Sequence, residues 1–446
     1  MNQQGTFFSA GCSLLLLVKT GVNLHRYQLL VTLLTTFFFL SFLFLIYNLS
    51  KLFHTQDIWG LIAFITMWVA ADFVPPSEGF LYLVGACVYA LPLSLGFLAS
   101  AFYLRLMNAD TNFAKALYII LSAGCAIACS GGVLIAAAMI NIFMVCIFLL
   151  KWAATRKLPI RGILPFLCAF GSALMNTIAP GNYVRFHSEV ASHMNLVSSV
   201  INTFLICLQQ IYHLFTHTYL LIGLTLIALF VCIIPTEKTA SDFRIHPLFV
   251  IFSTVVCCYI VLFPSVLGYQ LQLGTPIEQR ILFAFSWISS LCIVFAWTYT
   301  LLWVKVNKFN ENTSREGAIT LSAIALFVAL VLNLLYVPAM RMDSRPTLTT
   351  IFQEYRSGAL QQHYAAYHLL LLGAEAAEQG SHYVVTYEIP PSPLFMDHHL
   401  SADNTWWVNT TLAAVYQLGA FTYGPDHPFT EEDALAAGYT IEQLLP

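Results

Sequence analysis

Charged residues are scarce in this chain of 446 residues: Asp, Glu, Lys and Arg together make up 9% of it. An ordinary soluble domain carries about 25% charged residues, so the composition excludes that class. The net charge is only −3 and no run of basic residues occurs, so nothing indicates a nucleic-acid partner. Since 59% of the residues are hydrophobic, the sequence predicts that the lipid bilayer is the main partner of the chain.

Cysteine is missing from the C-terminal part of the chain, because the last of the eleven cysteines is Cys292. This excludes a disulfide framework in that part. Spacing suited to a metal site is missing as well. His213 and His217 have no third ligand at a useful distance, and neighbours such as Asp397 and His398 rarely converge on one ion. The sequence therefore predicts no metal centre.

Long apolar runs are what the sequence has in abundance. Each approaches the length of about 20 residues that crosses a bilayer as a helix, and in lipid only helices or closed barrels satisfy their backbone groups. The fold class that follows is an all-α polytopic bundle of about ten membrane helices. It occupies residues 1–336 and is followed by a water-exposed C-terminal module, residues 337–446. The runs are Tyr27–Tyr47, Gly79–Tyr103, Leu134–Leu150, Pro247–Leu267, Leu282–Val304 and Ala318–Tyr336.

Basic residues orient the bundle, because Lys and Arg accumulate in cytoplasmic loops. The densest cluster, Lys151 to Arg161, is therefore placed inside. Alternation of the helices then puts twelve basic residues inside and four outside before the last helix, provided that residues 200–215 do not span. Their polar side chains, such as Gln209 and Gln210, would be costly facing lipid, so we expect this segment to lie in the interface. Residues 7–18 are too short to span and are expected to be interfacial or the end of an outer loop.

This orientation collects functional groups at the outer face. Asp72 and Glu78 lie in the first outer loop, shortly before Tyr89, and Glu278 and Arg280 open a late helix. Ionisable residues at a membrane boundary are candidates for function, although they also form anchors and ion pairs. A simple ion pair, Glu78–Arg185 or Glu278–Arg185, is the alternative interpretation of these residues.

The most specific of the outer stretches runs from Asn176 to Arg185. Pro180 ends the preceding helix, Gly181 allows backbone conformations closed to other residues, and Asn182 can bond the local backbone. Such a turn would aim the planar guanidinium of Arg185 at a phosphate or a carboxylate. The alternative is a helix-ending turn whose arginine snorkels to the interface.

The C-terminal module is predicted to be small and α/β-like. Residues 347–380 are expected to be mainly helical, His382–Glu388 alternates like a strand, and residues 404–418 are an aromatic-rich helix or loop. The tail, Thr430–Leu445, is expected to be helical from a Thr cap. Its aromatic side chains suit binding of sugar or lipid headgroups, and packing against the membrane domain explains them equally well. Asn409-Thr-Thr matches a glycosylation sequon, which matters only in a eukaryote.

These features together resemble the bacterial polytopic membrane family catalogued as domain of unknown function 6056, which is itself similar to the GT-C class of membrane glycosyltransferases. The resemblance covers most of the chain, and the turn with Pro180 and Arg185 is its most specific part. The matching residues are Glu78 with the stretch Tyr82–Pro92, the turn Ala179-Pro-Gly-Asn-Tyr-Val-Arg185, Arg280, and Trp407-Val-Asn409.

The resemblance implies a GT-C-like transferase of the bacterial inner membrane, with an extracytoplasmic C-terminal domain, that takes a sugar from a polyprenyl-phosphate carrier. In such enzymes an acidic residue of the first outer loop acts as base or metal ligand, so Asp72 and Glu78 are the catalytic candidates and a divalent cation stays open as cofactor. Arginines neutralise the departing phosphate. The supporting positions are Tyr89, Asn176, Pro180, Gly181, Asn182 and Glu278, with Trp407 and Asn409 in the C-terminal module, and Arg185 and Arg280 are the phosphate contacts.

The chain also departs from the family pattern. The pattern begins with an anchor helix and an outer loop with paired acidic residues, whereas here Gln4–Ser9 resembles the stretch after that loop, with Thr6 in place of an arginine. Gly131 stands where the family has an acidic residue. We therefore expect a transferase that is either truncated at its N-terminus or degenerate. The alternative is a non-enzymatic component, flippase-like or a scaffold, of a surface-polysaccharide system.

Overall fold

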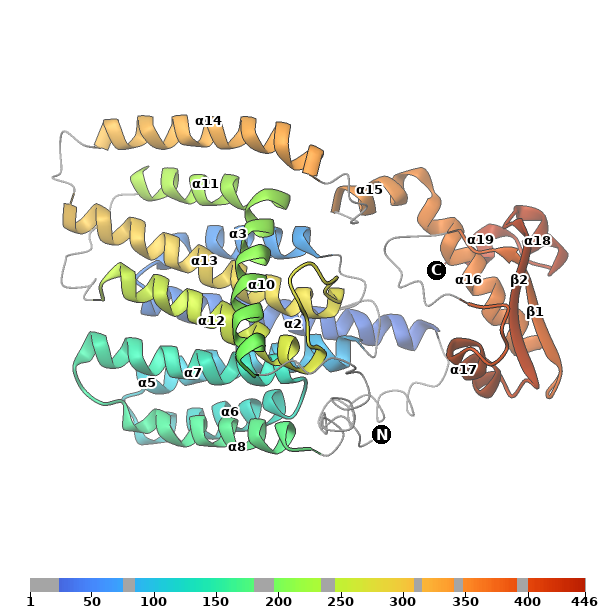
Figure 1. Ribbon diagram of the computed structural model, residues 1–446, viewed down its shortest axis with the longest axis horizontal. Helices are drawn as coiled ribbons and strands as arrows, with labels where there is room; N and C mark the ends of the chain where they lie inside the picture. The colour runs from blue at the N-terminus through green and yellow to red at the C-terminus, as the bar shows by residue number, and fades with distance from the viewer. Residues whose placement is uncertain are drawn as a thin grey trace. The chain divides into compact units, whose positions relative to one another are not determined.

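The computed structural model describes residues 24–74, 85–179, 196–233, 245–308, 315–340, 348–390 and 400–445. The chain divides into two compact units, Met1–Ser344 and Arg345–Pro446, and each is described by itself below. Unit 1 is helical throughout its described residues (Figure 1). Its longer helices are α2 (Leu24–Leu52), α3 (Trp59–Phe73), α5 (Leu91–Met107), α6 (Asn112–Ser130), α7 (Leu134–Thr155), α8 (Ile163–Thr177), α10 (Leu196–His217), α11 (Leu220–Ile233), α12 (Pro247–Tyr269), α13 (Gln279–Lys308) and α14 (Arg315–Met340).

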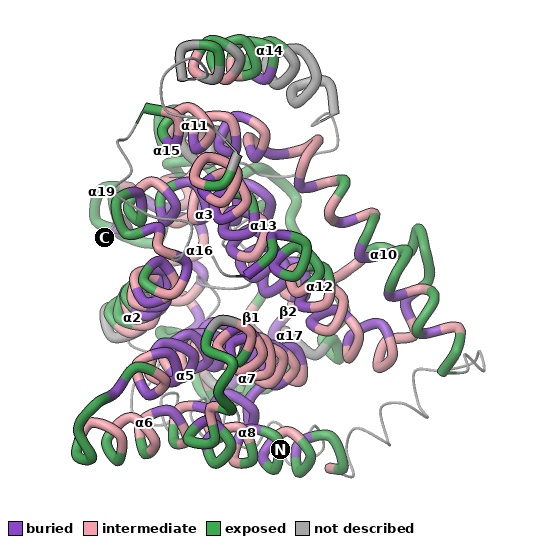
Figure 2. The backbone as a smooth tube through the Cα atoms, turned by 90° about the vertical axis from the view of Figure 1, so that its left-hand side faces the viewer, coloured by how far each residue is buried: buried purple, intermediate pink, exposed green. Residues whose placement is uncertain are grey.

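Within the described residues, seven helices are long and apolar enough to cross a membrane, or eight if the bent pair α10–α11 forms one span. The all-α membrane bundle predicted from the apolar runs is confirmed at this level, while the count of about ten helices stays a prediction. Figure 2 shows where burial concentrates. In the most apolar 18-residue stretch of each helix, 83% of α13 is buried but only 22% of α6. The helix α13 is therefore the centre of the unit, and α6 lies at its periphery.

Helix α10 runs across the direction of its neighbours rather than along it (Figure 1). It meets α11 at a bend of 73°. Its buried face carries Ser199, Thr203 and Gln210, so polar groups that are costly in lipid face the protein. Its exposed face is apolar, an arrangement opposite to that of a helix on a water-soluble protein. The exposed residues include Val197, Ile201, Phe204 and Leu208. This arrangement suits the interfacial position predicted for residues 200–215, which stays a prediction.

Basic side chains tie helices together at one end of unit 1. The Arg105 guanidinium, at the end of α5, donates to Asn48 of α2 (3.2 Å) and lies over the Phe44 ring. Two further contacts join α7 and the start of α8 to the loop after α5: Lys151 donates to Asn108 (2.5 Å) and Arg161 to the carbonyl of Ala109 (3.1 Å). These residues belong to the group predicted to lie inside, and the structure brings them together.

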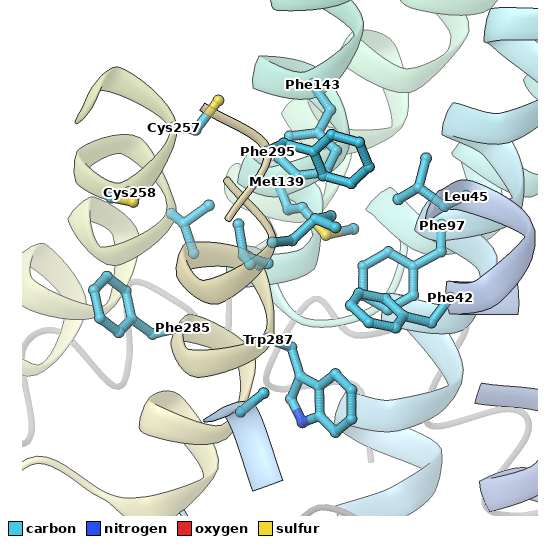
Figure 3. Packing of buried hydrophobic residues seen from close by; sticks show 14 of the residues in the cluster. Phe42, Leu45, Phe97, Met139, Phe143, Cys257, Cys258, Phe285, Trp287 and Phe295 are labelled. Atoms are coloured by element: carbon cyan, nitrogen blue, oxygen red, sulfur yellow. The ribbon is translucent and has the colours of Figure 1, made fainter. Parts of the chain in front are cut away.

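The core of unit 1 is built around aromatic side chains of α2, α5 and α13 (Figure 3). The Trp287 ring lies 4.9 Å from that of Phe38 and 5.0 Å from that of Phe42, measured between centroids, and Phe42 lies 5.0 Å from Phe97. All four side chains are buried, and their edge-to-face and tilted geometries are those that aromatic rings prefer. This cluster fixes α13 against α2 and α5.

Unit 2 is a small α/β module. Its elements are α15 (Leu348–Ser357), α16 (Ala359–Ala376), β1 (His382–Glu388), α17 (Trp407–Tyr416), β2 (Ala420–Pro428), α18 (Glu431–Ala436) and α19 (Ile441–Leu444). The predicted strand is confirmed with its bounds, and so is the Thr430 cap, which forms a capping box with Asp433. The sequence prediction missed β2, which pairs in parallel with β1.

Candidate functional site

A cavity of about 980 Å³ opens among α7, α8 and α12. Each of these helices presents one apolar face to it, with lining residues three or four positions apart. Examples are Ala138 and Ile142 on α7, Phe166 and Phe170 on α8, and Phe263 and Leu267 on α12. Since ligand cavities are commonly about 300–1,000 Å³, this one is large enough for a substantial molecule.

The cavity lies on one side of a contact between α7 and α12 near the middle of both helices. At this contact the Cys146 and Cys257 sulfurs are 3.6 Å apart. Beyond it the α7 wall extends from Val145 to Leu134, which is about 17 Å at the rise of an α-helix. This is about half of the hydrocarbon thickness of a bilayer. The cavity therefore reaches from the far end of the helices to about the middle of a membrane.

We take the end of the cavity where α7 begins and α12 ends as its open end; tyrosines stand there, and Asn141, Thr177 and Ser265 also line the cavity. Tyr89, from the π-helical turn η3 (Ala86–Ala90), and Tyr269, from the end of α12, line it together with Ile281. Arg280 precedes Ile281 in the chain and lies close enough to both tyrosines that either of them, if ionised, would favour the charged guanidinium. It also donates from Nε to Glu278 (2.5 Å), and both members of this pair are partly exposed. A cation and two hydroxyls thus stand where an apolar cavity ends, which is the arrangement that an amphiphile with an anionic headgroup requires.

Three residues proposed from the sequence, Tyr89, Glu278 and Arg280, therefore meet at one place. Asn176 has a different role. It is fully buried, and its side-chain amide donates to the carbonyls of Ser130 (2.8 Å) and Gly132 (2.7 Å). It anchors the end of α8 to the turn between α6 and α7.

Asp72 and Gly131, like Arg280 and Glu278, are not among the residues that line the cavity, and no described contact links them to it. Asp72 is buried in the last turn of α3. Gly131 ends α6, in the turn that Asn176 holds. The structure therefore gives neither position a role in the cavity, and the assignment of Asp72 as a catalytic candidate still depends on the sequence.

The remaining predicted positions lie outside the described residues. These are residues 7–18, Glu78, Pro180, Gly181, Asn182 and Arg185, and the side chain of Trp407 in α17 is not described either. The described residues nearest to Arg185 in the chain are Ala179, shortly after α8, and Leu196, where α10 begins. The helix α8 is one wall of the cavity, and in α10 the Val200 carbonyl accepts from Tyr259 on α12, another wall (3.2 Å).

In unit 2, the Asn409 side chain is buried and bonded on both its nitrogen and its oxygen, so the folded module does not expose this sequon for glycosylation. In the part of the chain that the structure describes, no three His, Cys, Asp or Glu side chains are grouped so that they could hold a metal ion. The structure gives no support to the divalent cation that the resemblance left open.

Sequence reasoning missed the cavity itself. One signal for it was present: Pro264 interrupts the apolar run of α12, and a proline inside a helix removes a backbone hydrogen bond and bends the axis. The sequence does not show which helices stand opposite Pro264.

No family model, curated protein or solved structure matches this chain. The class that the fold and the cavity define is therefore a polytopic helical membrane protein, and the resemblance to GT-C glycosyltransferases stays a prediction.

Proposed function

We propose that this protein is a GT-C-like glycosyltransferase that uses a polyprenyl-phosphate sugar as donor. The observation that carries the proposal is the apolar cavity, one of whose lining residues, Ile281, follows Arg280 directly in the chain. A polyprenyl chain needs a long apolar space, and its phosphate needs a fixed cation at the end of that space. Because the described basic contacts gather at the opposite end of the bundle, we propose that the open end of the cavity faces outward from the bacterial inner membrane. For the C-terminal domain the extracytoplasmic side is proposed from the sequence.

In this proposal the lipid tail fills the space between α7, α8 and α12, and the phosphate lies against Arg280. The hydroxyls of Tyr89 and Tyr269 stand at the same end and can donate hydrogen bonds to phosphate oxygens. Glu278 accepts from Nε of Arg280 and so orients the guanidinium plane. Arg185 is the second proposed phosphate contact, from the sequence.

The reaction would be a displacement at the anomeric carbon. An acceptor hydroxyl oxygen forms the new bond to that carbon, the bond to the phosphate oxygen breaks, and the acceptor proton passes to a carboxylate base. Arg280 would stabilise the negative charge that develops on the departing phosphate. Asp72 and Glu78 are the residues proposed from the sequence as the base.

The test is photo-crosslinking of a polyprenyl phosphate that carries a photoreactive tail, on the full chain in lipid nanodiscs. Arg280→Ala should weaken binding at least about tenfold, because a charge-assisted hydrogen bond contributes about 1.5–3 kcal/mol. Ala138→Phe should also weaken it, by filling the cavity. Arg356→Ala, an exposed arginine of unit 2, is the matched control. Undiminished crosslinking in both Arg280→Ala and Ala138→Phe would sink the proposal.

One observation favours the alternative of a non-enzymatic, flippase-like or scaffold component. Glu278, the carboxylate beside the open end in the described part of the chain, is engaged with Arg280. A binding protein needs no further acid. The two functions separate in one assay with a radiolabelled lipid-linked sugar: release of the lipid phosphate from its sugar supports the transferase, and binding without release supports the alternative.

A further inference from the structure

Unit 2 presents an exposed aromatic side chain on a loop. Residues 400–406 lead into α17, and Trp406 at the end of this loop exposes 43% of its surface (Figure 1 shows α17). Its neighbours Asp403, Asn404 and Thr405 are also exposed. Tyr355 of α15 is exposed as well, so exposure by itself does not distinguish Trp406; the loop that carries it does.

The loop is held from behind by a buried side chain. The Asn409 amide donates to the carbonyls of Ser401 and Asp403 (3.0 Å to the latter), and its oxygen accepts from the backbone N–H of Ser401 (3.3 Å). The Ser401 carbonyl also accepts from the N–H of Tyr423 in β2 (3.0 Å), which attaches the loop to the sheet. The backbone that carries Trp406 is therefore fixed before any ligand arrives.

The exposed side of the loop is ordered as well. The Asp403 carboxylate accepts from the N–H (2.8 Å) and the hydroxyl (2.7 Å) of Thr405, and the Trp406 N–H donates to the Asp403 carbonyl (3.1 Å). The hydrogen bonds from Thr405 lower the pKa of the Asp403 carboxyl, which stays ionised at neutral pH. One ordered loop thus carries an apolar ring, an anionic acceptor and the side-chain amide of Asn404.

We propose that this loop is a carbohydrate-binding site, in which Trp406 stacks on a pyranose ring while Asp403 and Asn404 bond its hydroxyls. A sugar ring combines an apolar C–H face with a rim of hydroxyls, and an aromatic ring beside polar groups complements both. Because the loop is already ordered, binding costs little conformational entropy. The carboxylate of Asp403 would repel an anionic lipid headgroup, so a neutral glycan is the better occupant than the membrane surface.

The site stands independently of the proposed transferase activity, since it involves no residue of unit 1. If both hold, the loop would retain a glycan acceptor near the membrane. The test uses the full chain in detergent and three probes, the hexasaccharides of cellulose, chitin and starch. Saturation-transfer NMR and calorimetry would report the binding of each.

We expect at least one hexasaccharide to bind, and Trp406→Ala to weaken it about tenfold or more, as for other anchoring aromatics. Trp406→Phe should retain most of the affinity, and Asp403→Asn should alter it without unfolding the module. The control is Tyr355→Ala, which removes another exposed aromatic of unit 2 and should change nothing.

Two results would overturn the proposal. One is that no probe binds, or that Trp406→Ala binds as the wild type does. The other is that brominated lipids in nanodiscs quench the tryptophan fluorescence of the wild type, and that the quenched component is missing from Trp406→Phe. Trp406 would then be an anchor in the membrane interface. Failure here leaves the lipid-phosphate crosslinking of the cavity unchanged, so the two proposals are tested separately.

Discussion

Replacing Asn176 by alanine is expected to destabilise unit 1 by about 2–6 kcal/mol. The side chain is fully buried, and its amide donates two short hydrogen bonds, to Ser130 and Gly132, that join the end of α8 to the turn between α6 and α7. Alanine would leave two buried carbonyls without this donor, and each such loss costs about 1–3 kcal/mol. Asn176→Asp keeps the shape but removes the donor, so it should destabilise at least as much.

A matched control exists on the neighbouring helix. The Asn141 amide donates to the Ala137 carbonyl within its own helix (2.8 Å), so Asn141→Ala breaks no contact between helices. It should cost less than about 1 kcal/mol, since alanine also favours the helix. The assay is thermal unfolding of the purified chain in one detergent, followed by intrinsic fluorescence. Equal midpoints for the two alanine variants would refute the anchoring role of Asn176.

Two further predictions concern unit 2. Protonated His427 donates hydrogen bonds to the carboxylates of Asp433 and Asp426, which raise its pKa. Its contribution to stability should therefore be complete below about pH 6.5 and disappear as the pH rises through the raised pKa. His427→Gln should therefore flatten the fall in melting temperature above pH 6.5. Gly419→Ala should destabilise unit 2 by about 1–3 kcal/mol, because its Cβ would lie 2.3 Å from the Gly380 carbonyl oxygen, and limited proteolysis of the full chain would detect this.

Each of these two predictions has its own control variant. His382 of β1 forms a hydrogen bond with the Thr422 hydroxyl and not with a carboxylate. In His382→Gln the fall in melting temperature above pH 6.5 should therefore persist. Gly424→Ala changes another glycine of β2, where the added Cβ meets nothing within 4 Å. If the protease cleaved Gly424→Ala and Gly419→Ala equally fast, close packing at Gly419 would not be the cause of the destabilisation.

The sequence determined the parts of this protein that depend on local composition. An apolar run long enough to cross a bilayer must form a helix there, so the bundle followed from the runs alone. The strand His382–Glu388 and the helix capped by Thr430 followed from alternation and a capping residue. The choice of Arg280, Glu278 and Tyr89 as boundary residues also needed only the sequence.

Only the tertiary structure decided what those residues do together. Apolar faces attract one another without direction, so the sequence of α7 and α12 does not reveal that they touch at Cys146 and Cys257 and that the cavity lies on one side of this contact. In the same way Asn176, which looked like part of a binding turn, proved to bond two carbonyls more than forty residues earlier in the chain. A cavity is space between faces, and its place depends on how neighbouring helices pack, which no single segment encodes.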